Sequence, residues 1–268
     1  MKPASVVIVG MGHIGGSLGM ALLTRRLARR VVGIDSDPAV LRRALRRRAC
    51  TETAQNLWPV AGADLVVLAT PVRTIQSLAW KIAELQLPGT RITDVGSAKA
   101  GIMRAFRGVR GFVGGHPMCG TERGGIEAAD PALFKGATWA LVPGDRAALP
   151  AMKKLVVQLG AVPLVVTAQA HDRAVALISH LPYALALALV RLGRKGGPLA
   201  ARLAAGSFRS ATRVAAQPAA MSLDLLLANR FHVAAALERM GDDLRGLAMA
   251  LRKGDEAALK RFQKEGLR

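Results

Sequence analysis

The sequence predicts an α/β fold class in which a doubly wound, mainly parallel sheet domain is followed by an all-helical domain. Three observations carry this prediction. From Ser5 to about Thr167, short β-branched runs alternate with amphipathic helical patterns. The first run leads directly into closely spaced glycines, and after Thr167 the strand signals stop in favour of Ala-, Leu- and Arg-rich helical periodicity. We therefore expect one domain over residues 1–168 and a second over residues 169–268.

Within the first domain, seven apolar runs are predicted strands and four amphipathic stretches are predicted helices. The strands are SVVIVG, VVGID, DLVVLAT, TRITDVG, GFVGG, ATWALV and AVPLVV, and the helices are Ile14–Arg29, Pro38–Arg48, Val72–Leu85 and Ala147–Leu159.

The second domain is predicted to be wholly helical. Helical periodicity is clear over Leu223–Met240 and Asp242–Arg252. The segment Leu181–Val190 carries more apolar surface than a small bundle hides easily, so we expect a helix buried in a homodimer interface.

Cysteine usage and hydropathy indicate a cytoplasmic protein. Cys50 and Cys119 form no Cys-x-x-Cys pair and lie near no histidine cluster, so neither a disulfide framework nor a zinc site is expected. The N-terminal apolar run leads into glycines rather than a cleavage site. His180 and Pro182 interrupt the apolar stretch Ala174–Val190, which favours a buried helix over a membrane span.

The formal charge of +20 would attract anions of many kinds. Much of it lies in the segments LTRRLARR and VLRRALRRR, where basic and apolar residues alternate as on solvated helix faces. Aromatic residues make up 4% of the chain, with a single tyrosine, so stacking surfaces for nucleic acid are poorly supplied. Solvated helix faces therefore explain the charge better than a nucleic-acid role, and composition alone does not choose among the anions.

A G-x-G-x-x-G pattern follows the first predicted strand and predicts a Rossmann-like dinucleotide site. Gly10 permits the tight turn, Gly12 lets the backbone approach a pyrophosphate, and Gly15 allows close packing of helix on sheet. Asp35, at the end of the second strand, is placed to bind a ribose 2′-hydroxyl. The predicted cofactor-binding residues are Gly10, Gly12, His13, Ile14, Gly15, Asp35, Thr70 and Pro71.

The carboxylate of Asp35 favours NAD over NADP, because it would repel a 2′-phosphate and the next two residues supply no arginine. Arg42 and Arg43 on the following helix could soften that preference. Thr70 and Pro71 end the third predicted strand where a loop meets the cofactor, although an ordinary turn would also explain them.

Two further strands end in polar loops, Asp94–Lys99 and Gly114–Glu122, which should face the cofactor because ligands bind beyond the carboxyl ends of parallel strands. Oxidation of an alcohol by a dinucleotide cofactor needs a group that accepts the hydroxyl proton as hydride leaves the alcohol carbon. His116 is the candidate for this group. A loop histidine that bonds only backbone is the alternative. Cys–His nucleophilic chemistry with Cys119 is disfavoured, since no acyl-transfer motif accompanies it.

The segments GMGHIGGSLG, DVGSAK, GGHPMCGTERGG, DRAVALISHLP and GSFRSATRVA occur in this order, and together the chain resembles the prephenate/arogenate (cyclohexadienyl) dehydrogenase family over nearly its whole length. The loop HPMCGTERGG and the segment SHLP are more diagnostic than the glycine pattern. No metal is implied by the resemblance.

The resemblance implies roles for individual residues. His116 would hydrogen-bond the ring hydroxyl of the substrate with help from Ser97, and Arg213 would bind a substrate carboxylate. His180 would line the site, although a core histidine explains it equally well. Glu122 would lie near the mouth of the site.

The reaction implied is the NAD-dependent oxidative decarboxylation of prephenate to 4-hydroxyphenylpyruvate with release of CO₂, a step of tyrosine biosynthesis. Tyr183 replaces the last histidine of SHLPH and is counted among the predicted substrate-binding residues, and no tryptophan follows Pro218. Arogenate or dual specificity therefore stays open. Another small-acid or imine dehydrogenase, or a non-catalytic nucleotide or nucleic-acid binder, is a remoter alternative.

Overall fold

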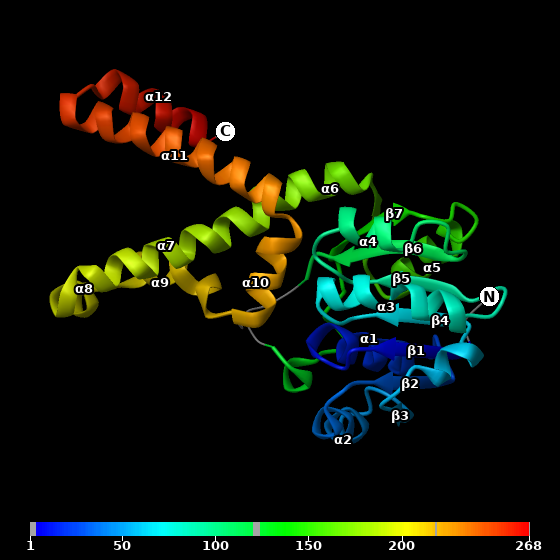
Figure 1. Ribbon diagram of the computed structural model, residues 1–268. Helices are drawn as coiled ribbons and strands as arrows, with labels where there is room; N and C mark the ends of the chain where they lie inside the picture. The colour runs from blue at the N-terminus through cyan, green and yellow to red at the C-terminus, as the bar shows by residue number, and fades with distance from the viewer. Residues whose placement is uncertain (1–3, 120–123, 218, 268) are drawn as a thin grey trace.

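The computed structural model describes residues 4–119, 124–217 and 219–267, without the side chains of residues 219–221. It has two parts, a layered sheet and an extended arrangement of helices (Figure 1). Glu122 lies outside the described residues.

The described strands form one sheet in the order β3-β2-β1-β4-β5-β6-β7-β8. Neighbours from β3 to β6 are parallel, β7 pairs antiparallel with β6, and β8 pairs parallel with β7. From β1 the strands are added toward one edge of the sheet, and from β4 they are added toward the other edge. Such sheets bind ligands at the point between β1 and β4 where this order reverses. The strands are β1 (Ser5–Val9), β2 (Arg30–Ile34), β3 (Glu52–Ala54), β4 (Leu65–Leu68), β5 (Arg91–Asp94), β6 (Phe112–Pro117), β7 (Thr138–Pro143) and β8 (Val162–Val165).

Helices cover both faces of this sheet, which makes it doubly wound. In β1, Val6 and Ile8 point into the core cluster beneath α1 and α5, while Val7 and Val9 point into the cluster beneath α3 and α4. This alternation follows from the two-residue period of a strand buried on both faces. The helices here are α1 (His13–Thr24), α2 (Pro38–Arg46), η1 (Trp58–Gly62), α3 (Val72–Leu85), α4 (Ala100–Ala105), η2 (Ile126–Ala128) and α5 (Leu149–Gln158).

After β8 the described chain is helical. Thr167 caps the first of these helices by accepting a hydrogen bond from the N–H of Ala170 at 3.2 Å. Near the other end, Gly254 adopts φ +63° and closes a long helix, and Asp255 caps the next by accepting from the N–H of Ala258. The elements are α6 (Ala168–Val175), η3 (Ala176–His180), α7 (Leu181–Lys195), α8 (Gly197–Leu203), α9 (Gly206–Thr212), η4 (Arg213–Ala216), α10 (Ala219–Ala228), α11 (Arg230–Lys253) and α12 (Glu256–Gly266).

One continuous helix joins α6, η3 and α7, and η3 is a turn of π-helix. Pro182 explains the position of this turn. A proline inside a helix lacks an N–H and its ring clashes with the carbonyl four residues earlier, so the preceding turn widens. A wider turn of this kind is frequent at functional sites, and here it ends at the buried His180.

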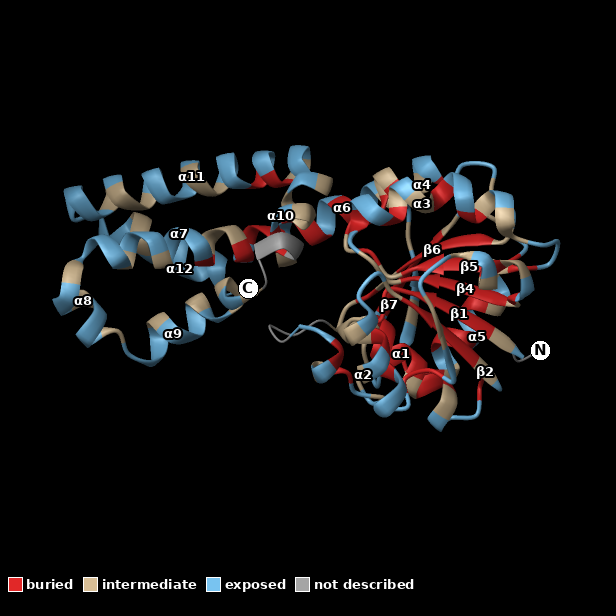
Figure 2. Ribbon diagram, turned by 60° about the horizontal axis from the view of Figure 1, so that its bottom comes forward, coloured by how far each residue is buried: buried red, intermediate tan, exposed pale blue. Residues whose placement is uncertain are grey.

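This helix, Ala168–Lys195, is by length and composition apolar enough to cross a membrane, with a mean hydropathy of 1.8 in its most apolar window and 33% of that window buried. It contains Pro182 and carries buried polar groups at its N-terminal end. Figure 2 shows that the helical part is mostly exposed, in contrast to the buried sheet. Within the segment Leu181–Val190, the chain itself buries Leu181, Tyr183 and Ala186 and leaves Leu187 and Leu189 exposed. Burial of this segment in a homodimer interface stays a prediction.

The fold class predicted from the sequence is confirmed: a mainly parallel, doubly wound sheet is followed by helices. All seven expected strands are present. The short edge strand β3 and helix α4 are additional elements, and the break between α10 and α11 falls at Asn229, inside the stretch expected to be one helix.

Candidate functional site

The glycine loop after β1 has the geometry that a dinucleotide requires. Gly10 adopts φ +97°, and a Cβ added there would come within 2.7 Å of the Ala69 backbone. A Cβ on Gly15 would lie 1.9 Å from the carbonyl oxygen of Gly10, so only glycine allows this approach of helix to turn. At Gly12 a Cβ would meet nothing within 4 Å, which leaves open space beside the loop.

The N-terminus of α1 opens onto that space. Gly12 is its N-cap residue and provides no side-chain hydrogen bond, so the first N–H groups of the helix keep no cap from that residue. His13 and Ile14 begin the helix, with Ile14 packed against the core and His13 partly buried. Burial lowers the pKa of His13, so its ring is neutral at neutral pH. A neutral ring and a positive helix end suit a pyrophosphate.

Asp35 follows β2 and accepts hydrogen bonds from the N–H of Met11 at 2.9 Å and of Asp37 at 3.1 Å. These two bonds hold the carboxylate beside the glycine loop. Just after β4, the hydroxyl oxygen of Thr70 is buried without a hydrogen-bond partner in the described structure, and Pro71 is the N-cap residue of α3. An orphaned buried hydroxyl at the same edge as the glycine loop fits a bound cofactor.

His116 lies at the carboxyl end of β6, half-buried. The glycines before it are required by close packing, because a Cβ on Gly115 would come within 2.4 Å of the Asp94 carbonyl oxygen. The buried Lys99 ammonium donates to the Asp94 carboxylate and, at 2.6 Å, to the carbonyl oxygen of Gly115. Asp94 also accepts from the N–H of Gly115. This network fixes the backbone that carries His116.

The ring of His116 contacts a second histidine. Its Nδ1 lies 2.8 Å from Nε2 of His171 on α6, and Nδ1 of His171 lies 2.8 Å from a carboxylate oxygen of Asp172. Burial, together with His171, Lys99 and His180, lowers the pKa of His116 well below its ordinary value. His116 is therefore neutral at neutral pH and can accept a proton.

His180, which comes from the helical part, belongs to the same cluster. Its Nδ1 lies 3.2 Å from the side-chain nitrogen of Asn229, which also donates to the carbonyl oxygen of Asp172 at 2.7 Å. Its Nε2 is buried and has no partner in the described structure. Burial lowers the pKa of His180 to about 4. A neutral histidine with an unused ring nitrogen is a candidate ligand-binding group, and Tyr183 lies buried one turn further along α7.

Other predicted site residues are placed less closely. Ser97 lies in the loop between β5 and α4, and no hydrogen bond joins it to His116 within the described residues. Arg213 is exposed at the start of η4, between α9 and α10. Both roles remain predictions.

Chemistry based on cysteine is disfavoured by the structure. Burial raises the pKa of Cys119 to about 12 and that of Cys50 to about 11, so both thiols are protonated at neutral pH. In the described residues, no group of three or more His, Cys, Asp and Glu side chains is positioned to hold a metal ion.

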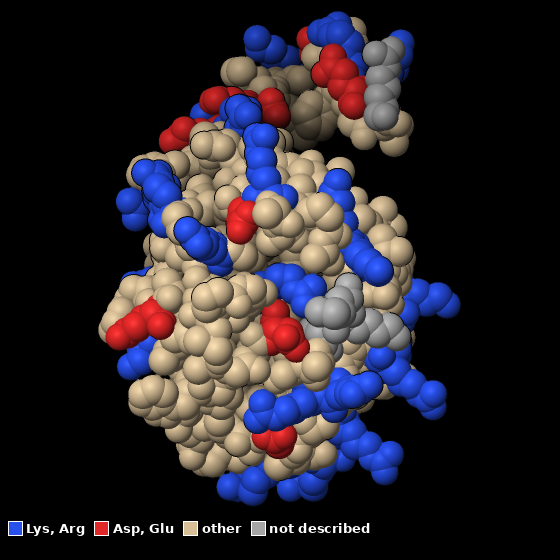
Figure 3. Space-filling model, turned by 90° about the vertical axis from the view of Figure 1, so that its right-hand side faces the viewer, with Lys and Arg blue, Asp and Glu red and all other residues tan. Residues whose placement is uncertain are grey.

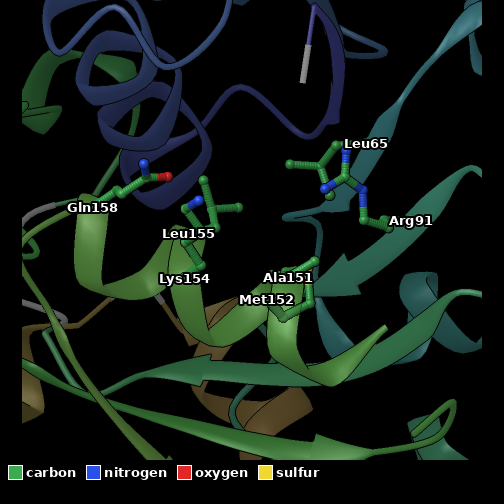
Figure 4. Close-up of a pocket in the computed structure, with 7 residues that line it drawn as sticks. All are labelled: Leu65, Arg91, Ala151, Met152, Lys154, Leu155 and Gln158. Carbon is green, nitrogen blue, oxygen red and sulfur yellow. The ribbon is translucent and has the colours of Figure 1, made fainter. Parts of the chain in front are cut away.

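Two hollows in the described structure lie apart from this cluster. One of about 30 Å³ is found at the amino ends of β4 and β5, next to α5, where Leu65, Arg91 and Leu155 line it (Figure 4). The other, of about 500 Å³, lies between α4 and the start of α6 and is lined by Arg104, Arg107 and other residues. Neither is lined by His116 or the glycine loop.

Reasoning from the sequence missed four members of the site: Lys99, His171, Asp172 and Asn229. The loop Asp94–Lys99 was recognised, but nothing in it showed that the lysine points inward. Asp172 opens the segment DRAVALISHLP and His171 directly precedes it, so their signal was proximity to a recognised motif. Asn229 lies in a stretch of ordinary helical periodicity and gave no signal.

A glycine-loop sheet with a neutral histidine at its carboxyl edge, completed by groups from a helical part, defines the class of dinucleotide-dependent dehydrogenases. Family models agree. The nucleotide-binding domain of prephenate dehydrogenase matches residues 18–165, and the dimerization domain of prephenate dehydrogenase matches residues 167–265. The chain belongs to the prephenate dehydrogenase family.

Individual relatives show the same likeness. The prephenate dehydrogenase of Lactococcus lactis is 31% identical over 97% of this chain and 75% of its own length. That of Bacillus subtilis is 33% identical over 84% of this chain, which spans 64% of the relative. The crystal structure of Aquifex aeolicus prephenate dehydrogenase in complex with hydroxyphenyl propionate and NAD⁺ superposes with a TM-score of 0.91 at 28% identity, over 98% of this chain and 96% of that one.

Proposed function

We propose that this protein is an NAD-dependent dehydrogenase of tyrosine biosynthesis that oxidatively decarboxylates prephenate to 4-hydroxyphenylpyruvate and CO₂. The observation that carries this proposal is the neutral imidazole of His116, which lies at the same edge of the sheet as the glycine loop. Family membership supports the substrate class, and the relative solved with NAD⁺ supports the cofactor.

His116 would act as the proton acceptor. The ring hydroxyl gives its proton to the imidazole as hydride leaves the carbinol carbon, and the C–C bond to the ring carboxylate breaks to release CO₂. Bound NAD supplies the acceptor for that hydride. The electron pair of the broken bond makes the ring aromatic, and the phenolate oxygen takes the proton back. No net proton is released, so His116 returns to its neutral form.

Asp35 supports NAD over NADP. Two backbone N–H groups hold its carboxylate beside the glycine loop, where it would accept from a ribose hydroxyl and repel a 2′-phosphate. The open space at Gly12 leaves room for the pyrophosphate, and Gly10, His13, Ile14, Gly15, Thr70 and Pro71 complete the proposed cofactor site.

The substrate carboxylates need cationic or donor partners. Arg213 is proposed to bind one of them, because a guanidinium offers two parallel donors to a carboxylate. His180 and Tyr183 would line the pocket from the long helix, and Ser97 would contact the hydroxyl from the loop after β5.

Arogenate is the alternative substrate. It carries an amine in place of the keto group, so its side chain needs a different binding partner on the protein from that of prephenate. Tyr183, where SHLPH would place a histidine, and the lack of a tryptophan after Pro218 favour a changed side-chain pocket. Dual specificity follows if neither substrate side chain is strongly recognised.

A homodimer formed through the helical part is proposed as the working assembly, in a cytoplasmic setting. The family's second domain is a dimerization domain, and the long helix exposes Ile178, Leu187, Leu189 and Leu192. Figure 3 shows Lys and Arg spread around one face of the sheet part rather than gathered in one stripe, which favours general anion attraction over a nucleic-acid groove.

The assay that tests the function offers prephenate and arogenate at equal concentration to the purified protein, each with NAD and with NADP, and follows NADH or NADPH absorbance. We expect turnover with NAD and little with NADP. The ratio between the two substrates decides specificity. If neither substrate is oxidised, the proposed reaction is wrong and another small-acid dehydrogenase activity takes its place.

A further inference from the structure

His116 is joined to the helical part by a chain of three side chains that runs from His116 through His171 to Asp172. Both histidine–partner distances are 2.8 Å. His171 and Asp172 are buried, and they come from α6, whereas His116 comes from β6. A contact between elements so far apart in the chain is not set by local sequence, so its geometry reflects how the two parts pack.

The far end of the chain is a fixed hydrogen-bond acceptor. Asp172 also accepts from the backbone N–H groups of Lys99 at 2.7 Å and Ala100 at 2.8 Å, where α4 begins. Burial raises the pKa of Asp172, but the bonds from His171 and these two N–H groups outweigh that effect and lower it overall. Asp172 is therefore ionised, and an ionised carboxylate only accepts.

The direction of every proton in the chain then follows. Because Asp172 only accepts, Nδ1 of His171 carries a proton, and when the ring carries that single proton its Nε2 is bare. That bare Nε2 accepts from Nδ1–H of His116. His116 is consequently protonated on Nδ1 and bare on Nε2, which is the nitrogen left to receive a proton from a substrate hydroxyl.

We propose that His171 and Asp172 are positioning residues that hold His116 in its Nδ1–H tautomer and share the positive charge formed when its Nε2 takes the hydroxyl proton. This inference rests on the proposed function. In the step, the substrate O–H bond breaks and an Nε2–H bond forms, while the Nδ1–H of His116 strengthens its bond to His171. Return of the proton to the product oxygen restores the starting tautomer.

The other charged groups around His116 explain why such a pair is needed. Burial disfavours a positive charge on His116 most, and His171, Lys99 at the start of α4 and His180 on η3 add to that effect. Asp94 is engaged by Lys99, so it does not offset that effect at His116. Asp172 is the carboxylate in line with the ring, and it acts through His171.

The test compares three variants at saturating NAD. In Asp172→Asn, the amide can donate to His171 and favour the opposite tautomer, so we expect kcat to fall about 100-fold or more with little change in KM. In His171→Leu, the acceptor is lost and a similar fall is expected. His171→Gln keeps a carbonyl oxygen that can accept from His116 and should recover part of the activity, and His232→Gln on α11 is the matched control.

A second measurement reads the tautomer directly. Nitrogen-15 NMR of histidine-labelled protein, loaded with NAD and free of substrate, should show His116 protonated on Nδ1 in the wild type and shifted toward Nε2–H in Asp172→Asn. This readout does not depend on turnover, so it separates failure of the proposed tautomer from failure of the proposed function.

Three outcomes would overturn the inference. One is a wild-type His116 that carries its proton on Nε2. Another is kcat within about twofold of wild type in both Asp172→Asn and His171→Leu. Equal losses in all variants, with a lowered melting temperature and an unchanged pH profile, would likewise assign the pair a purely structural role.

Discussion

At the scale of single residues, the proposed role of His116 as proton acceptor depends on its neutrality. Replacing His116 by Asn removes the proton acceptor but keeps a polar side chain at the end of β6. We expect kcat to fall about 10²- to 10⁴-fold, as for a lost general base, while the affinity for NAD changes little. Steady-state kinetics and a calorimetric NAD titration measure the two quantities, and full turnover in the variant would refute the assignment.

The pH profile of the wild type provides the control for that experiment. Since the surroundings lower the pKa of His116, the acid side of the kcat/KM profile should fall at a pH below the ordinary histidine value of 6.5. Activity is lost as pH falls, because a protonated imidazole cannot accept the hydroxyl proton. An acid limb centred above that value would mean that another group controls the step.

Arg213 is expected to act on substrate binding rather than on chemistry. Arg213→Ala removes a charge-assisted hydrogen-bond partner of a carboxylate, an interaction worth about 1.5–3 kcal/mol. We therefore expect KM for the substrate to rise about 10- to 100-fold with a smaller change in kcat. Arg209→Ala, one turn earlier on α9, is the matched control, and an unchanged KM in Arg213→Ala would exclude the proposed contact.

Protonation of His180 should make the free energy of unfolding depend on pH in the acid range. Its pKa in the folded protein is about 4, against 6.5 for an ordinary histidine, so the unfolded chain binds the proton first as pH falls. The free energy of unfolding should decrease between about pH 6.5 and pH 4, by at most about 3 kcal/mol from this residue. Urea unfolding should show a shallower acid loss in His180→Gln than in the wild type or in His232→Gln. Equal slopes would contradict the prediction.

At the scale of elements, two glycines of one loop should respond differently to the same substitution. In Gly15→Ala the new Cβ meets the Gly10 carbonyl oxygen at 1.9 Å, so the turn must shift and stability should fall by several kcal/mol. In Gly12→Ala the new methyl enters open space, so the fold should persist while NAD affinity falls. Thermal melts with and without NAD distinguish the two, and identical behaviour would argue against the assigned roles.

Strands such as β1 and β4 were predictable because each is a short β-branched run buried on both faces. The direction of β7 was not, since an antiparallel partner for β6 leaves no mark in an apolar run. The edge strand β3 has the sequence ETA and only partial burial, so it lacked an apolar signal. Helix α4, with six residues, is too short for periodicity to reveal.

The site residues likewise fall into those that the sequence could predict and those that it could not. Residues in loops directly after strands, such as Gly10, Asp35 and His116, could be placed from the sequence, because strand ends converge on one edge. His171, Asp172 and Asn229 reach that edge only through packing of the helical part against the sheet. The division into residues 1–168 and 169–268 remains a prediction; β8 ends at Val165 and α6 begins at Ala168.

At the scale of the whole molecule, the exposed leucines of the helical part determine assembly. Leu192 on α7 is 67% exposed, and a monomer would leave it and its neighbours in water. We expect the 28.2 kDa chain to sediment as a dimer, and Leu192→Glu to shift it toward the monomer. Leu87→Glu is a control of similar exposure, on the sheet part. A wild-type monomer at micromolar concentration would exclude the proposed dimer.

The π-helical turn η3 also fixes how far α7 is rotated about the helix axis relative to α6. A π turn holds one residue more than an α turn, so it rotates everything that follows it about the helix axis, by roughly 100°. His171 lies before this turn, and the exposed leucines of α7 lie after it. Deleting one residue between 176 and 179 would leave the histidine facing β6 and turn the apolar side of α7 away from its present direction. The extra residue of this turn thus allows one helix to direct His171 toward β6 and to present the exposed leucines of α7 in their observed direction.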